Sequence, residues 1–161
     1  MGLPLAIAQK IASRISAELA PMCERIEIAG SIRRQRPHVN DIDLVILPHA
    51  GQTAAIKSRC ESKSRVIING DQNYIVQLPG NGVAGGLQLD IFFARRPTKD
   101  LFDPQPTNFG SLLLCRTGSK EHNITLRRRA IELGMKLNEY ALAKGDKVIA
   151  SRTEKDIYKA L

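Results

Sequence analysis

Two acidic residues lie at the start of the most aliphatic stretch of the chain, where residues 41–47 read Asp-Ile-Asp-Leu-Val-Ile-Leu. This run predicts a β-strand that ends at Pro48. Side chains two residues apart on a strand face the same way, about 7 Å apart, so Asp41 and Asp43 lie side by side. Two such carboxylates repel each other, and a divalent cation between them removes that conflict. Oxygen ligands favour Mg²⁺ or Mn²⁺ over zinc.

A third acid, Asp90, interrupts the apolar segment 87–93, which also predicts a strand. If the two strands are neighbours in one sheet, Asp90 joins Asp41 and Asp43. The Asp-x-Asp pattern alone is a weak signal because solvated surface strands carry it often.

The turn before the acidic strand supports a phosphate site. Gly30 and Ser31 follow a predicted strand at 25–29, so their backbone amides, the Ser31 hydroxyl and the Arg34 guanidinium can surround an anion. The alternative is a solvated basic turn. That alternative explains the charge but not the Gly-Ser pair or the two acids that follow.

The net charge and the composition limit the classes of partner that the chain can bind. The 161 residues carry a net charge of +8, which favours an anionic partner, nucleic acid first and acidic membrane second. The aliphatic run 44–47 is too short to cross a bilayer and no signal peptide opens the chain, so we expect a cytoplasmic protein and no membrane partner. Three scattered cysteines predict neither a disulfide framework nor a zinc site.

Hydrophobic periodicity predicts both helices and strands. The expected helices cover residues 3–20, 51–60, 108–116, 119–133 and 153–161. The expected strands cover 25–29, 41–47, 65–68, 74–78 and 87–93, with two or three more within 135–148. The change of character after Pro97 predicts two lobes, residues 1–97 and 98–161.

Several motifs together resemble one family. The run Gly30-Ser31-Ile32-Arg33-Arg34 followed by Asp41-Ile42-Asp43 resembles the palm signature of family X DNA polymerases, the DNA polymerase beta family. Downstream, residues resemble that family's thumb in the same order: Thr117-Gly118-Ser119, Asn123, Arg127 and Leu137-Asn138-Glu139-Tyr140. The resemblance implies an α+β fold. It has a nucleotidyltransferase palm at 1–97, with a mixed β-sheet and flanking helices, followed by a small polymerase-beta-type thumb at 98–161.

The resemblance also implies two-metal chemistry in the palm. Asp41, Asp43 and Asp90 would be the catalytic residues and would hold two Mg²⁺ ions, with Mn²⁺ as a substitute. The triphosphate would be bound by Gly30, Ser31 and Arg34.

In the thumb, the resemblance assigns two groups of residues. Sugar and base contacts fall to Cys115, Arg116, Gly118 and Asn123. DNA contacts fall to Ser119, Lys120, Arg127 and Arg128, although a solvated basic face explains Arg128 equally well. The family's cis peptide would lie between Gly118 and Ser119.

Two positions depart from the family. Cys115 and Arg116 stand where the polymerases usually carry aromatic residues that select the sugar, so ribonucleotide incorporation stays open. Phe92 stands where better-known members have an arginine that restrains the catalytic acid.

We therefore expect a template-directed DNA polymerase. It would add deoxynucleotides from their triphosphates to primer-template or gapped DNA, as a monomer of low processivity that fills short gaps in repair. One alternative is a nucleotidyltransferase with a tRNA, protein or small-molecule acceptor. Another is an inactive nucleic-acid-binding module.

Overall fold

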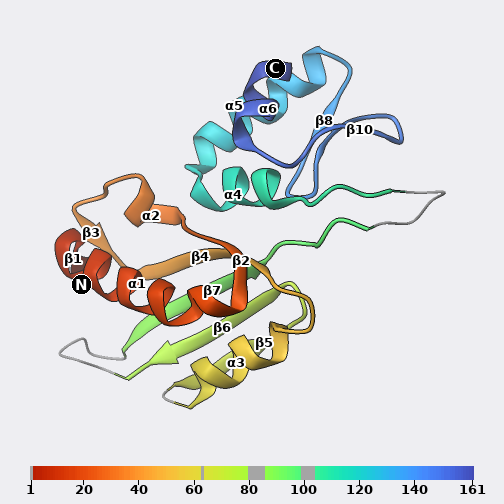
Figure 1. Ribbon diagram of the computed structural model, residues 1–161. Helices are drawn as coiled ribbons and strands as arrows, with labels where there is room; N and C mark the ends of the chain where they lie inside the picture. The colour runs from red at the N-terminus through yellow and green to blue at the C-terminus, as the bar shows by residue number, and fades with distance from the viewer. Residues whose placement is uncertain (1, 63, 80–85, 99–103) are drawn as a thin grey trace. The chain divides into compact units, whose positions relative to one another are not determined.

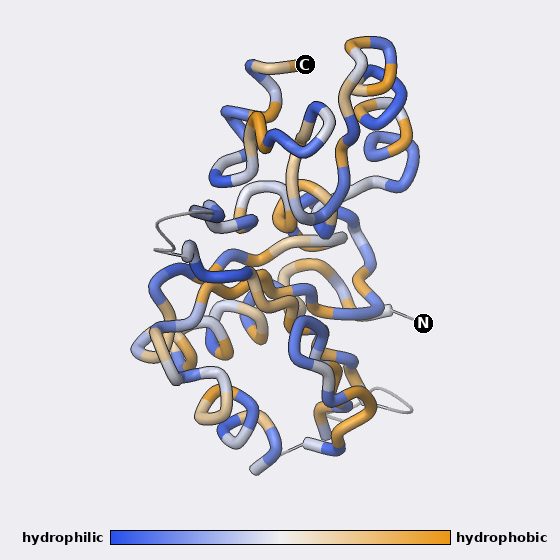
Figure 2. Tube along the Cα trace, turned by 90° about the vertical axis from the view of Figure 1, so that its right-hand side faces the viewer, coloured by the Kyte–Doolittle hydropathy of each residue, from blue (hydrophilic) through white to orange (hydrophobic). Residues whose placement is uncertain are grey.

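The computed structural model describes residues 2–62, 64–79, 86–98 and 104–161. Contacts divide the chain into two compact units, Met1–Phe93 and Ala94–Leu161. The boundary predicted from the sequence lies slightly later, after residue 97. Figure 2 shows orange, hydrophobic stretches in both parts of the trace, so each unit has apolar residues with which to build a core.

A five-stranded sheet forms the centre of the first unit, in the order β2-β4-β7-β6-β5 (Figure 1). Strands β4 and β7 are parallel, whereas the other neighbours are antiparallel, so the sheet is mixed. The elements of this unit are β1 (Leu3–Pro4), α1 (Leu5–Leu19), the 3-10 helix η1 (Ala20–Met22), β2 (Cys23–Ile28), α2 (Gly30–Arg33), β3 (His38–Val39), β4 (Asp41–Pro48), α3 (Thr53–Glu61), β5 (Arg65–Asn69), β6 (Asn73–Leu78) and β7 (Leu87–Phe93). The expected α+β fold is confirmed.

Helices α1 and α3 cover one face of this sheet. Alternate residues of β4, Ile42, Leu44 and Ile46, are fully buried in one cluster with Ala8 and Ala12 of α1. The same cluster contains Ile56 and Cys60 of α3. Because side chains alternate along a strand, the residues between them face the opposite side of the sheet.

Two details of the first unit differ from the expected elements. The predicted helix at 3–20 begins only at Leu5, because Leu3 and Pro4 pair with Val39 and His38 as short strands. The predicted turn at Gly30-Ser31 is instead the first part of the one-turn helix α2.

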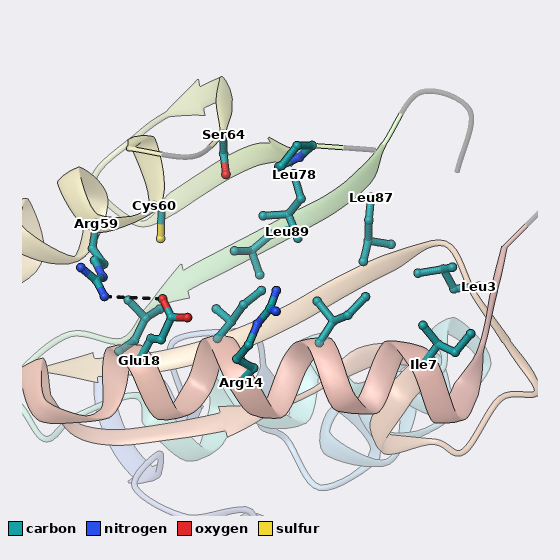
Figure 3. A pocket seen from close by; sticks show the side chains of 14 residues that line it. Leu3, Ile7, Arg14, Glu18, Arg59, Cys60, Ser64, Leu78, Leu87 and Leu89 are labelled. Carbon is teal, nitrogen blue, oxygen red and sulfur yellow. Dashed lines mark ion pairs between the residues drawn. The ribbon is translucent and has the colours of Figure 1, made fainter. Parts of the chain in front are cut away.

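An apolar cavity of about 470 Å³ lies between α1, α3 and the sheet (Figure 3). Leu87 and Leu89 of β7 form part of its wall, and the Arg59–Glu18 ion pair, 3.8 Å between Nη2 and Oε2, lies at its edge. Since Asp90 alternates with Leu89, the acidic residues lie on the other face of the sheet. This cavity is therefore separate from the acidic residues.

The second unit combines helices with a three-stranded antiparallel sheet in the order β10-β9-β8. Its elements are α4 (Phe109–Thr117), α5 (Lys120–Glu132), β8 (Lys136–Leu137), β9 (Leu142–Lys144), β10 (Lys147–Ala150) and α6 (Glu154–Ala160). Its buried core includes Leu114, Ala130, Leu142 and Ile157. The helices and short strands expected here are confirmed, each within a few residues.

Among the described residues, no helix is both long and apolar enough to span a bilayer.

Candidate active site

The three predicted acids lie together on two neighbouring strands. In the parallel pairing of β4 with β7, Asp43 lies directly opposite Asp90, and Asp41 lies opposite Gln88. All three acidic side chains are half-buried, while the alternating Ile42 and Leu44 are fully buried on the other face. The backbone thus places three carboxylates on one face of the sheet, away from α1 and α3.

Gly30 is in direct contact with this acidic group. Its φ of +57° is one that residues with a side chain rarely adopt, and a Cβ at this position would overlap the Asp43 carboxylate. The backbone N–H of Ala29 donates to the Asp43 carbonyl at 2.9 Å. The Gly30-Ser31 segment therefore packs against the acidic strand at Asp43.

The predicted phosphate-binding residues lie on α2, next to that contact. Helix α2 packs against β4. The Ser31 hydroxyl is buried and has no hydrogen-bond partner among the described residues, so it is available to donate to a phosphate oxygen. Arg34, also half-buried, follows directly at the end of the helix.

The side chains do not form a finished metal site. In the described part of the chain, no three histidine, cysteine or acidic side chains are gathered closely enough to hold an ion. Instead, the Gln88 side-chain amide donates to Asp90 Oδ1 at 2.7 Å. The donor set, three carboxylates with hard oxygens, nevertheless fits Mg²⁺.

The predicted sugar, base and DNA contacts lie in the second unit, around the junction of α4 and α5. The peptide bond between Gly118 and Ser119 is cis, as the resemblance implies. The Ser119 side chain caps α5 by accepting from the His122 backbone N–H at 3.4 Å.

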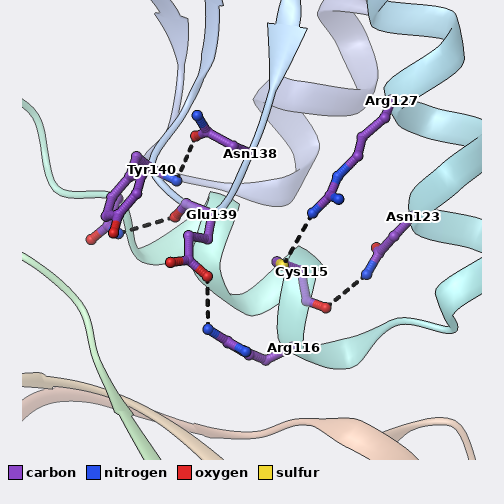
Figure 4. A network of polar contacts seen from close by, with 8 residues as sticks. Cys115, Arg116, Asn123, Arg127, Asn138, Glu139 and Tyr140 are labelled. Carbon is purple, nitrogen blue, oxygen red and sulfur yellow. Dashed lines mark hydrogen bonds and ion pairs between the residues drawn. The ribbon is translucent and has the colours of Figure 1, made fainter. Parts of the chain in front are cut away.

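Two of these residues, Asn123 and Arg127, contact a third, Cys115 (Figure 4). The Asn123 side-chain amide donates to the Cys115 carbonyl at 2.8 Å, and Arg127 Nη2 donates to Cys115 Sγ at 3.8 Å. One turn of α5 separates Asn123 from Arg127, so both side chains reach the end of α4 from the same helix face.

Arg116 is held by a residue outside the predicted site. Its Nη2 lies 2.7 Å from Glu139 Oε2, and about a third of each side chain is exposed. Glu139 lies in the Asn-Glu-Tyr segment that supports the resemblance, but the sequence gives no direct sign of this pairing. Lys120, Arg127 and Arg128 are all exposed on α5.

Comparisons with known proteins support the same family for both units. Residues 112–161 match the model of the DNA polymerase beta thumb. Over 142 residues the chain is 30% identical to the DNA polymerase/3'-5' exonuclease PolX of Bacillus subtilis (strain 168). That match covers 86% of this chain but only 23% of the relative, so the chain spans about a quarter of the length of that curated protein.

Two crystal structures of Leishmania infantum polymerase beta have a similar fold. The ternary P/T complex matches with a TM-score of 0.72 and 22% identity over 99% of this chain and 73% of that one. The ternary gap complex matches with a TM-score of 0.73 and 21% identity over 99% of this chain and 67% of that one. These two likenesses show a shared fold, and together with the sequence matches they support a family X polymerase-like protein.

Proposed function

We propose that this chain is a template-directed DNA polymerase that adds deoxynucleotides to the 3′ end of a primer. The observation that carries the proposal is the pairing of Asp43 opposite Asp90, with Asp41 on the same face and Gly30 against the Asp43 carboxylate. Nucleotidyl transfer needs cations that neutralise the phosphates, a group that favours loss of the proton from the attacking hydroxyl, and a binding site for the triphosphate. The three carboxylates suit the first two tasks, and the Gly30-Ser31 segment beside them suits the third.

The acidic residues are proposed to hold two Mg²⁺ ions, for which Mn²⁺ would substitute. When bound, the ions supply positive charge that eases loss of the primer hydroxyl proton and neutralises the leaving pyrophosphate. Asp41 and Asp43 would contribute carboxylates toward both ions. Asp90 would face the primer terminus and favour removal of its proton.

The remaining residues are proposed to bind the nucleotide and the DNA. The Ser31 hydroxyl, the Gly30 backbone and Arg34 would bind the β and γ phosphates. In the second unit, Asn123 would reach the incoming base, and Cys115, Arg116 and Gly118 would border its sugar. Ser119, Lys120, Arg127 and Arg128 would contact the DNA strands. The net charge of +8 suits such a partner.

A biological role follows from this chemistry as a proposal. We propose that the chain acts as a monomer, with low processivity, in the filling of short gaps during DNA repair. Long products made in a single binding event on a long template would contradict that role.

The test of the catalytic assignment is primer extension in Mg²⁺ by the whole chain and by Asp43→Ala. We expect the variant to lose roughly a hundred- to a thousandfold in rate, because the site loses one of the carboxylates proposed to hold the metal ions. Asp71→Ala, which removes an exposed acid in the turn before β6, is the matched control and should extend normally. Equal activity of Asp43→Ala and the unmodified chain would overturn the assignment.

A further inference from the structure

Gln88 lies beside the three acidic residues, and the proposed function gives it no role. It lies two residues before Asp90 on β7, and so on the same face of the sheet. The pairing with β4 places it opposite Asp41. It is half-buried, and its Nε2 donates to Asp90 Oδ1 at 2.7 Å. A neutral amide therefore lies beside the Asp90 carboxylate, on the face of the sheet that also carries Asp41 and Asp43.

Phe92, two residues after Asp90, cannot donate a hydrogen bond to the Asp90 carboxylate. Phe92 also faces the same way as Asp90, and only 5% of it is exposed. A phenyl ring has no hydrogen atom to donate to a carboxylate. The resemblance to polymerases implies an arginine at this position, and this chain has Phe92 there instead.

From this arrangement we propose that Gln88 is a positioning residue that orients the Asp90 carboxylate for metal binding and catalysis. This inference rests on the proposed function. A carboxylate can rotate about its last bond, and a donor fixed to one oxygen limits that rotation. Because the amide is neutral, it orients the carboxylate without cancelling the negative charge that attracts the ion.

The sheet supplies a closely matched control. Gln77 on β6 lies directly opposite Gln88 in the antiparallel pairing, on the same face, and is also half-buried. The substitutions Gln88→Leu and Gln77→Leu thus make the same chemical change on adjacent strands. Leucine has nearly the same size as glutamine, so neither variant should open a large cavity.

The test is Mn²⁺ binding, measured by the loss of the free-ion electron paramagnetic resonance signal. It uses the unmodified chain and both variants without DNA or nucleotide. We expect Gln88→Leu to weaken Mn²⁺ binding about tenfold, the effect usual for a residue that orients a metal ligand, and Gln77→Leu to leave it unchanged. Circular dichroism, followed while each variant is heated, shows whether the variant is folded and whether its Tm equals that of the unmodified chain.

A second measurement separates this inference from the proposed function. In primer extension, Gln88→Leu should lower kcat with little change in KM for the nucleotide, since Gln88 is not proposed to touch the nucleotide. If the unmodified chain extends no primer while Mn²⁺ binding still depends on Gln88, the proposed function fails and the positioning role stands. If Gln88→Leu and Gln77→Leu bind Mn²⁺ equally, or if the unmodified chain binds none, the positioning role is wrong.

Discussion

Gly30 is the residue whose replacement tests the site most simply. An alanine there meets the Asp43 carboxylate and must also adopt a φ of +57°. We expect Gly30→Ala to lower the free energy of unfolding by about 2–4 kcal/mol, from overpacking and from the left-handed backbone together. It should also greatly reduce activity, because the displaced carboxylate is a proposed catalytic group.

Gly51→Ala separates the two causes. Gly51 has a φ of +76° but open space around its Cβ position, so this variant has the backbone strain without the collision. Urea unfolding should show a loss of about 1 kcal/mol for Gly51→Ala and a clearly larger loss for Gly30→Ala. Equal losses would mean that the contact with Asp43 does not matter.

The buried cysteines make a prediction about pH. Burial raises the pKa of both Cys23 and Cys60 to about 11 from an unfolded value of 9.0, and the negative charges of Glu61 and Glu18 add to the shift at Cys60. The neutral thiol is thus favoured in the fold. Its contribution to stability is complete below pH 9 and is lost as the pH rises from 9 toward 11.

Alkylation by iodoacetamide at pH 8, followed by mass spectrometry, checks this account. The half-buried Cys115 should be modified first, and Cys23 and Cys60 should react only as fast as the chain unfolds. In denaturant all three should react alike. Modification of Cys60 in the folded chain at the rate of Cys115 would be inconsistent with its burial.

For single residues, the sequence predicts on which face of a strand an acidic side chain lies better than it predicts which residue that side chain contacts. Alternation along a strand is a local rule, so Asp41 and Asp43 could be placed on one face without a structure. The position of Asp90 followed only from the assumption that its strand is a neighbour. The Arg116–Glu139 ion pair joins residues far apart in the chain, and no local pattern contains that information.

Among the elements, the contact of α4 with α6 gives the clearest prediction. A Cβ on Gly110 of α4 would overlap the backbone of Thr153, which caps α6. Helix propensity alone predicts that Gly110→Ala stabilises the protein by about 1 kcal/mol. We expect the opposite sign, a loss of about 2 kcal/mol or more, because backbone cannot move aside as a flexible side chain can.

Thermal unfolding of Gly110→Ala decides between these two signs. A fall in Tm about twice as large as that of Gly134→Ala, which should lose only the roughly 1 kcal/mol of backbone strain, would support the close helix contact. Gly134 lies just after the end of α5 with open space around its Cβ position, so its substitution has only backbone strain. A raised Tm for Gly110→Ala would show that the two helices do not meet as described.

The elements also show where sequence patterns fail. Long helices and strands follow from periodicity because many residues contribute to each. The two-residue strands β1 and β3 were missed because they exist only through their pairing with each other. Similarly, α2 contains a Gly-Ser pair typical of a turn, yet its backbone completes one helical turn against β4.

For the whole molecule, we propose that these 161 residues perform templated nucleotide transfer. Its similarity to a curated polymerase covers only about a quarter of that protein, so activity has to be measured on this chain itself. Each predicted lobe, 1–97 and 98–161, contains 12 basic and eight acidic residues, so +4 from each gives the total of +8. Charge alone would therefore allow DNA binding by either lobe without any catalysis.

The decisive measurement is extension across a one-nucleotide gap in duplex DNA with Mg²⁺. Each of the four template bases is combined with each deoxynucleotide and each ribonucleotide separately. We expect a single addition of the complementary deoxynucleotide on every template, lost in Asp90→Ala, and the ribonucleotide reactions will show whether Cys115 and Arg116 permit a 2′-hydroxyl. Addition of the same nucleotide whatever the template, or binding of the gapped duplex without any addition, would contradict a templated polymerase.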